Sequence, residues 1–270
     1  MCEVNIELKK FVRYENGKKV LYLQLLKALY GCMESVLLWH NLYISTLHSM
    51  GFKLNPYDKC TANRDVEGSQ QTLCFYVDDN KIFHKNRRVN EEVIKKLEEH
   101  FGKFDTSYGK EHSFLGMMII FIGKGKFEID MTEYQMESIT AIGEDYKSWK
   151  KVAAPAAKYL HSINPHSRKL DEEKKEIFHS VVSKNLWIAK RGRPDIDPAM
   201  SFLCTRVSEP TMEDWRKLRR VLQYMYQTIH EKRVIGAKRL HELFTWIGAA
   251  YAVHNDMRSR TGGAMYFGTK

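Results

Sequence analysis

Two adjacent aspartates interrupt a run of strand-forming residues in the segment TLCFYVDDNKIF, residues 72–83. Neighbouring side chains of a strand point to opposite faces of its sheet, so Asp78 and Asp79 can serve a single site only where the backbone turns sharply. The segment therefore predicts a strand, a tight turn within residues 76–80, and a second strand.

Two carboxylates that are held close together repel each other, which raises the pKa of at least one of them. A divalent cation with a preference for oxygen ligands, such as Mg²⁺ or Mn²⁺, removes that cost. Sites of this kind serve phosphoryl and nucleotidyl transfer, in which two metal ions about 4 Å apart activate the attacking hydroxyl and stabilise the leaving group. An aspartate-rich β-turn without a metal is the alternative reading of the same segment.

The surrounding sequence predicts a mixture of strands and helices. Asn16-Gly17 between two β-rich arms is typical of a two-residue hairpin turn, because both residues tolerate positive φ. Helical spacing of apolar residues predicts helices over 34–50 and 91–101, and Asn90 is the expected N-cap of the second helix.

Residues 112–131 are expected to add two more strands, and from about residue 132 the pattern becomes helical. The best-defined helix of this region begins after Thr211, with Asp214 as its partner in a capping box. A single β-hairpin is expected after Gly236. The helix that follows Thr211 also carries a basic surface, which is either a nucleic-acid contact or an ordinary solvated face: Arg216, Lys217, Arg219 and Arg220.

Composition narrows the class of partner. The 270 residues carry a net charge of +10, which favours binding to polyanions, and nucleic acid is the commonest of these for an intracellular chain. The five cysteines form no close pair, which argues against a zinc knuckle or a disulfide framework. The sequence begins without the apolar core of a signal peptide, and none of its apolar runs is long enough to span a membrane.

Six stretches, taken together and in order, carry a resemblance to a known family. They resemble the reverse transcriptase of copia-type retrotransposons, an RNA-directed DNA polymerase, followed by the start of its ribonuclease H domain. The stretches are LLKALYGCMESVLLW (25–39), YVDD (76–79), HSFLGMMI (112–119), LWIAKRGRPDIDPAMSFL (186–203), WRKLRRVLQYMYQTI (215–229) and AAYAVHNDMRSRTGGAMYFG (249–268).

The resemblance implies an α+β fold with three parts. Residues 1–131 would form a partial reverse-transcriptase palm, an antiparallel sheet with helices. Residues 132–235 would form a helical thumb and connection region. Residues 236–270 would form the N-terminal hairpin of an incomplete ribonuclease H-like domain.

The resemblance also implies roles for particular residues. Asp78 and Asp79 would be the catalytic carboxylates that hold Mg²⁺ or Mn²⁺, with Asp78 as the direct ligand and Asp79 as its support. Tyr76, Gly31 and Ser35 would position the primer and the nucleotide. The basic residues Arg216, Lys217, Arg219 and Arg220 would contact the nucleic-acid backbone.

Two departures from the family affect the expected activity. The family has a third catalytic aspartate upstream of the LYG block, whereas no aspartate precedes Asp58 here. Gly248 stands where the ribonuclease H domain has its first metal-binding aspartate. We therefore expect a fragment of a reverse transcriptase, truncated at both ends, with little or no polymerase activity alone and no ribonuclease H activity.

Two alternatives stay open at this point. The chain could be a non-catalytic, basic nucleic-acid-binding remnant, or an unrelated ferredoxin-like interaction domain with an Asp-Asp turn that arose by chance. The expected partners are an RNA/DNA primer-template and, if the chain is active, deoxynucleoside triphosphates, with no membrane partner. The expected location is intracellular, in the cytoplasm within a virus-like particle or in the nucleus, and the chain is not expected to be secreted.

Overall fold

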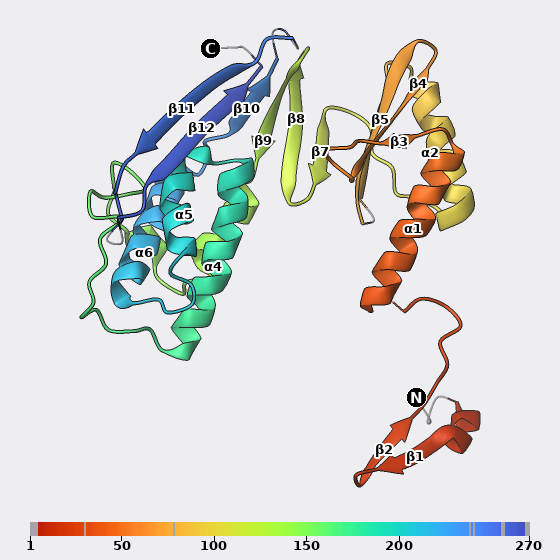
Figure 1. Ribbon diagram of the computed structural model, residues 1–270, viewed down its shortest axis with the longest axis horizontal. Helices are drawn as coiled ribbons and strands as arrows, with labels where there is room; N and C mark the ends of the chain where they lie inside the picture. Colours follow the sequence, from red (N-terminus) through yellow and green to blue (C-terminus); the bar gives the residue numbers. More distant parts are fainter. Residues whose placement is uncertain are drawn as a thin grey trace. The chain divides into compact units, whose positions relative to one another are not determined.

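A computed structural model describes residues 5–29, 31–77, 79–237, 239, 241–254 and 257–267. The chain divides into two compact units, Met1–Asp105 and Thr106–Lys270 (Figure 1). Each unit has a hydrophobic core of its own. None of the described helices is long and apolar enough to cross a bilayer.

The first unit begins with a short 3₁₀ helix and a small β-hairpin. The hairpin turns at Asn16 and Gly17, whose φ angles are 48° and 75°, as the Asn-Gly dipeptide predicts. In chain order the elements are the 3₁₀ helix Ile6–Phe11, β1 Val12–Glu15, β2 Lys18–Leu21, α1 Met33–Ser49, β3 Lys53–Leu54, β4 Thr61–Val66, β5 Ser69–Tyr76, β6 Asp79–Phe83 and α2 Arg87–Phe101.

The larger sheet of this unit is antiparallel, with its described strands in the order β3-β4-β5-β6. Helices α1 and α2 cover one face of this sheet (orange and yellow in Figure 1). Because side chains alternate along a strand, every second residue of β5 enters the core beneath these helices. The core is formed by Tyr43 and Leu47 of α1, Leu73 and Phe75 of β5, Val93 and Leu97 of α2, together with Phe52 and Ala62.

Helix α2 begins four residues earlier than the sequence predicts. Its N-cap is Asn86, whose side chain accepts a hydrogen bond of 3.1 Å from the backbone N–H of Arg88. Asn90, the predicted cap, lies inside the helix, where its Oδ1 accepts from the side chain of Gln71 at 3.0 Å. The prediction of Asn90 was wrong because two asparagines compete for the cap and the acidic pair after Asn90 favoured the later one.

The second unit contains a sheet, a group of helices and a terminal hairpin. In chain order its elements are β7 Glu111–Phe114, β8 Met117–Gly123, β9 Lys126–Asp130, α3 Thr132–Thr140, a 3₁₀ turn Tyr146–Ser148, α4 Glu172–Arg191, a 3₁₀ turn Pro194–Ile196, α5 Asp197–Cys204, α6 Met212–Gln227, β10 Arg233–Gly236, β11 Phe244–Ala250 and β12 Arg260–Tyr266.

The described strands of the second unit's sheet run in the order β10-β9-β8-β7, all antiparallel. The sequence predicted two strands over 112–131, but the structure has three, because the chain reverses at Leu115 and Gly116 with φ angles of 53° and 74°. Strand β10 lies in the predicted thumb except for Gly236, yet it pairs with β9 of the predicted palm. The three functional parts, 1–131, 132–235 and 236–270, stay a prediction beside these two compact units.

Helix α6 has the predicted capping box at its start. The hydroxyl of Thr211 accepts from the backbone N–H of Asp214, and the carboxylate of Asp214 accepts from the N–H of Thr211. Its apolar stripe is buried against α3, α4 and α5, with Trp215, Leu218, Leu222 and Met225 in the core. The predicted final hairpin is present as β11 and β12, and Gly248 lies in β11 opposite Gly262.

Candidate functional site

Strands β5 and β6 form the predicted hairpin, in which Tyr76 pairs with Asp79. Two residues separate this pair in the sequence. One of them, Val77, has a φ of 52°, and the other, Asp78, lies outside the described residues. A positive φ is unfavourable for a β-branched residue and costs about 1–3 kcal/mol. The tip of the hairpin therefore carries backbone strain.

Asp79 lies on the face of the sheet that α1 and α2 do not cover, here called the outer face. The strand register places it directly opposite Tyr76, and both side chains are exposed. Asp79 is therefore a carboxylate beside an aromatic ring at the end of a hairpin. The outer face of β5 and β6 is defined by Thr72, Cys74, Tyr76, Asp79, Lys81 and Phe83.

Lys81 follows Asp79 on the outer face and interacts with it electrostatically. Burial lowers the pKa of the Lys81 ammonium group, and the charge of Asp79 acts in the opposite direction, with burial the larger effect. The carboxylate of Asp79 therefore favours the charged form of Lys81. Without a further cation, part of the negative charge at the hairpin is already compensated by the protein.

On the covered face, Asn80 connects the hairpin to α1. The hydroxyl of Tyr43 donates a hydrogen bond to Asn80 Oδ1. Tyr43 is 1% exposed, and burial raises the pKa of its hydroxyl, which therefore remains protonated and able to donate. Trp39 stacks on Tyr43 with 4.9 Å between the ring centroids. These contacts fix the strand at the residue next to Asp79.

Gly31 and Ser35, predicted to position the nucleotide, lie at the start of α1. Gly31 has a φ of 91°, and the N–H of Ser35 donates to the carbonyl of Cys32 at 3.1 Å. At a rise of about 1.5 Å per residue, Ser35 is about 12 Å from Tyr43 along the helix axis. No described hydrogen bond joins either residue to the β5–β6 hairpin, so their role stays a prediction.

Lys217 departs from its predicted role as a nucleic-acid contact. Its side chain is buried, with 4% of the residue exposed. The ammonium group donates to the carbonyl of Ser162 and forms an ion pair of 3.3 Å with Glu213. A buried lysine whose charge is paired inside the protein cannot contact a phosphate. The prediction that Lys217 contacts the nucleic-acid backbone was therefore wrong.

The other three cations of α6 differ in their accessibility. Arg216 is exposed. Arg219 forms an ion pair of 2.5 Å with Glu144, and Arg220 donates to the carbonyl of Ala154 at 3.1 Å. These two side chains therefore hold the connector before α4 as well as carrying charge. A backbone contact by Arg216, Arg219 or Arg220 stays a prediction.

The described residues do not form a magnesium site by themselves. Among them, no group of three or more histidine, cysteine, aspartate or glutamate side chains is arranged to hold a metal ion. Asp79 is an exposed carboxylate, and Asp78, the second predicted ligand, lies outside the described residues. A single exposed carboxylate cannot replace enough of the water shell of Mg²⁺ to hold it tightly.

Arg193, for which no separate role was predicted, forms a buried polar network in the second unit. The residue is 2% exposed. Its guanidinium donates to Asp195 at 2.8 Å, to Gln135 at 2.9 Å and to the hydroxyl of Thr228 at 2.7 Å. The signal was its position in the block RGRPDI, directly after the amphipathic segment that forms α4. The hydrogen bonds of Arg193 therefore give this arginine of the RGRPDI block a structural role in the core of the second unit.

Comparison with known proteins relates the chain to retrotransposons. It is 24% identical over 243 residues to the transposon Ty5-1 protein of Saccharomyces cerevisiae, covering 89% of this chain and 76% of that protein. An uncharacterized mitochondrial protein of Arabidopsis thaliana is 29% identical over 157 residues, covering 58% of this chain and 62% of that protein. The retrovirus-related Pol polyprotein from transposon TNT 1-94 of Nicotiana tabacum is 26% identical over 219 residues, covering 78% and 16%.

No protein-family model matches the chain. No solved structure is significantly similar to it. The chain spans less than two thirds of the Arabidopsis relative and about a sixth of the tobacco polyprotein. The relatives with transposon names support a retrotransposon-derived protein.

Proposed function

We propose that this chain derives from the reverse transcriptase of a copia-type retrotransposon, an RNA-directed DNA polymerase that extends a primer with deoxynucleoside triphosphates. In this proposal the β5–β6 hairpin is the metal-binding hairpin of the polymerase site, with Asp78 and Asp79 as ligands of Mg²⁺ or Mn²⁺. One observation carries it: Tyr76 and Asp79 lie opposite each other at the end of a hairpin, on the sheet face that the described helices α1 and α2 do not cover.

The similarity to transposon proteins supports this assignment. The tobacco relative is by name a retrovirus-related Pol polyprotein, and a Ty1 relative from yeast is a Gag-Pol polyprotein, 24% identical over 228 residues. Each is similar to about four fifths of this chain, a region that includes more than the hairpin. An Asp-Asp turn that arose by chance would not account for similarity to transposon proteins along most of the chain.

The 270 residues are expected to extend a primer little or not at all by themselves. In-line nucleotidyl transfer needs two metal ions in a fixed geometry, and the family holds them with three carboxylates. This sequence has no aspartate before Asp58. Asp78 and Asp79 would therefore retain weak affinity for a divalent cation without the geometry that the reaction requires.

A non-catalytic nucleic-acid-binding protein is the second candidate function. The observation that favours it is the net charge of +10. Binding of this kind does not depend on base sequence and weakens as salt displaces the protein's cations from phosphates. The two candidates make different predictions for divalent metal ions, because only the polymerase-derived site links metal binding to the primer-template.

The experiment measures binding and extension of a DNA primer on an RNA template by the 270-residue chain, with and without Mn²⁺. We expect binding that weakens with salt and becomes tighter with Mn²⁺, because the metal ion offsets repulsion between the hairpin carboxylates and phosphate. Asp79→Asn should remove the effect of Mn²⁺. Asp65→Asn is the matched control, since Asp65 is an exposed carboxylate of β4 in the same sheet.

Three outcomes separate the hypotheses. Equal responses of the Asp79→Asn and Asp65→Asn variants to Mn²⁺ would contradict the polymerase-derived site and leave the basic binding protein. Binding that does not change with salt would contradict both candidates. Robust extension that Asp79→Asn abolishes would show a complete site and overturn the expectation of little activity.

A further inference from the structure

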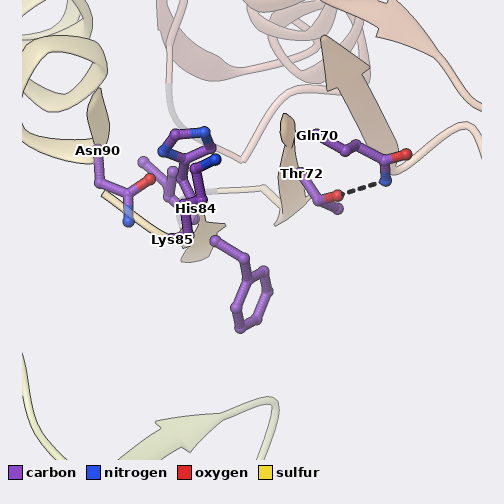
Figure 2. A pocket seen from close by; sticks show the side chains of 7 residues that line it. Gln70, Thr72, His84, Lys85 and Asn90 are labelled. Atoms are coloured by element: carbon purple, nitrogen blue, oxygen red, sulfur yellow. Dashed lines mark hydrogen bonds between the residues drawn. The ribbon is translucent and has the colours of Figure 1, made fainter. Parts of the chain in front are cut away.

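A second feature of the first unit is a pocket of about 400 Å³ where β5, β6 and the start of α2 meet. Its volume lies in the range of small-molecule sites. Figure 2 shows Gln70 and Thr72 on one side, Asn90 on the other, and His84 and Lys85 between them. The pocket lies four residues along the strands from the Tyr76–Asp79 pair, or about 13 Å at the usual rise.

An aromatic ring and a set of oriented polar groups line this pocket. Phe83 lies on the outer face opposite Thr72 and is 46% exposed. The Gln70 amide donates to Thr72 Oγ1 at 2.9 Å (Figure 2). It also donates to Asn63 Oδ1 at 3.0 Å. Both amide hydrogens of Gln70 are thus engaged, so its carbonyl oxygen is the group that it offers to a ligand.

The charges at the start of α2 are unusual for a helix. Lys85 lines the pocket, and Arg87 and Arg88 form the first turn, which has no acidic residue. Cations at the positive end of a helix dipole are unfavourable, by about 0.3–1 kcal/mol each when exposed. Glu91 offsets one of them through an ion pair of 2.7 Å with Arg87. Glu67, which accepts a hydrogen bond of 3.2 Å from the Asn86 side chain, balances one of the two remaining cations, Lys85 and Arg88. One positive charge is left in excess at this end of the helix, and a bound anion would neutralise it.

From these features we infer that the pocket binds one nucleotide unit of a single-stranded polynucleotide. The base stacks on the exposed face of Phe83, and the Gln70 carbonyl accepts a hydrogen bond from its edge. The phosphate lies against Lys85 and the positive end of α2. An aromatic ring beside cations is the combination that single-strand binding surfaces use.

The single strand is favoured over a duplex by the shape of the contact. A flat ring inside a pocket reaches the face of a base only when that face is not stacked on a neighbour. Charge complementarity favours a polyanion such as nucleic acid, because Lys85 lines the pocket and the first turn of α2 holds Arg88 and no acidic residue. The inference does not rest on the proposed polymerase site, since neither Asp78 nor Asp79 lines the pocket.

The experiment compares two labelled oligonucleotides of equal length and charge by fluorescence anisotropy, with the full 270-residue chain. One is a single-stranded oligo(dA) of twelve nucleotides, and the other has the same backbone without bases. Stacking of a base on an aromatic side chain predicts that the chain prefers oligo(dA) by about 5- to 150-fold. The preference should disappear in Phe83→Leu, which keeps the apolar bulk, and persist in Phe83→Tyr.

The substitutions Tyr57→Phe and Tyr57→Leu are the controls for the Phe83 variants. Tyr57 is 97% exposed in the same unit and does not line the pocket. Lys85→Gln should weaken binding of both oligonucleotides equally and reduce the salt slope by about 0.7, the value for one phosphate of a single strand. Lys59→Gln removes an exposed charge elsewhere and is its control.

Several results would overturn the inference. One is equal affinity of the wild-type chain for the two oligonucleotides, and another is a preference that survives in Phe83→Leu. Absence of binding to either oligonucleotide at low salt would also overturn it. Failure of primer extension or of the Mn²⁺ effect leaves the result for Phe83 unchanged, so this inference and the proposed function fail separately.

Discussion

At the scale of single residues, the tip of the β5–β6 hairpin places a β-branched side chain where the backbone favours asparagine or glycine. Val77 has a φ of 52°, in the left-handed region. Its side chain is 46% exposed, so little burial offsets the strain. Strain of this kind persists where the surrounding structure holds it, and candidate active sites are common places for it.

Val77→Asn should raise the free energy of unfolding by about 0.5–2 kcal/mol, because asparagine tolerates the left-handed region. Urea denaturation measures the change. Val36→Asn in α1 is the matched control: Val36 is 57% exposed in a helix, and this substitution should change stability by less than about 0.5 kcal/mol. A decrease in stability for Val77→Asn would show that the turn does not need a positive φ there.

The carboxyl of Asp195 predicts how the stability of the fold depends on pH. Burial alone would raise the pKa of its carboxyl, but the hydrogen bonds and charge of Arg193 outweigh burial and lower it. A lowered pKa in the folded state stabilises the fold above the ordinary aspartate pKa, near 4, and this contribution is lost as pH falls through the lowered value. Asp195→Asn should therefore be less stable than wild type at pH 7.

The difference between Asp195→Asn and wild type should shrink as the pH falls below about 4. Urea denaturation at pH 7, 5, 4 and 3 measures it. Asp105→Asn removes the same charge from an exposed loop and is the control. A difference that stays constant from pH 7 to pH 3 would contradict the role of the ionised Asp195 carboxylate.

At the scale of elements, the predictable features were those with local causes. The Asn16-Gly17 turn, the two long helices α1 and α6 and the capping box of Thr211 depend on residues close together in the sequence, and the structure confirms them. The start of α2 and the strand β7 were not predicted. Two asparagines competed for the α2 cap, and the turn after β7 uses Leu115, a residue that carries no turn signal.

Asn86→Ala should lower the free energy of unfolding by about 0.5–2 kcal/mol, because it removes the acceptor for the N–H of Arg88 at the start of α2. Asn86→Asp keeps this acceptor and adds a negative charge at the positive end of the helix, but it loses the hydrogen bond of 3.2 Å from Asn86 Nδ2 to Glu67, so it should lose less stability than Asn86→Ala. Thermal denaturation of both variants measures the difference. Equal losses in both variants would contradict the assignment of Asn86 as the cap.

The candidate site was only partly predictable, because only some of its contacts join residues that are close together in the sequence. Adjacency in the sequence was enough to predict the hairpin at Asp79, because the two strands and the turn are local. The roles of Lys217 and Arg193 depend on partners far away in the chain: Ser162 lies 55 residues before Lys217, and Thr228 lies 35 residues after Arg193. A basic residue on a predicted helix therefore gave no sign of whether it faced solvent or the interior.

At the scale of the whole molecule, the two compact units are joined by an exposed segment. Residues 102–110 contain no helix or strand and are mostly exposed, whereas each unit has its own core. Exposed loops between units are preferred sites of proteolysis. Limited digestion with trypsin should therefore cut at Lys103 or Lys110 before it cuts within α4, as mass spectrometry of early fragments would show. Early cuts inside α4 would contradict this division.

The similar proteins are the evidence about the function of the whole chain. They support a retrotransposon-derived protein, and the chain spans about a sixth of the tobacco polyprotein that it matches. The activities of such a polyprotein are therefore proposals for this chain, which is similar to only a part of it. We propose the hairpin and the pocket beside Phe83 as places where this chain contacts nucleic acid, and each has its own test.

We expect Asp78 and Asp79 to bind a divalent cation together, and iron-mediated cleavage of the backbone measures this binding at the hairpin itself. Fe²⁺ bound in place of Mg²⁺ generates hydroxyl radicals, with ascorbate and peroxide, that cut the nearby backbone. We predict cuts within residues 74–81 that excess Mg²⁺ suppresses, that Asp78→Asn and Asp79→Asn each abolish, and that Asp65→Asn leaves intact. Absence of cuts in this segment, or cuts that persist in both hairpin variants, would contradict the claim.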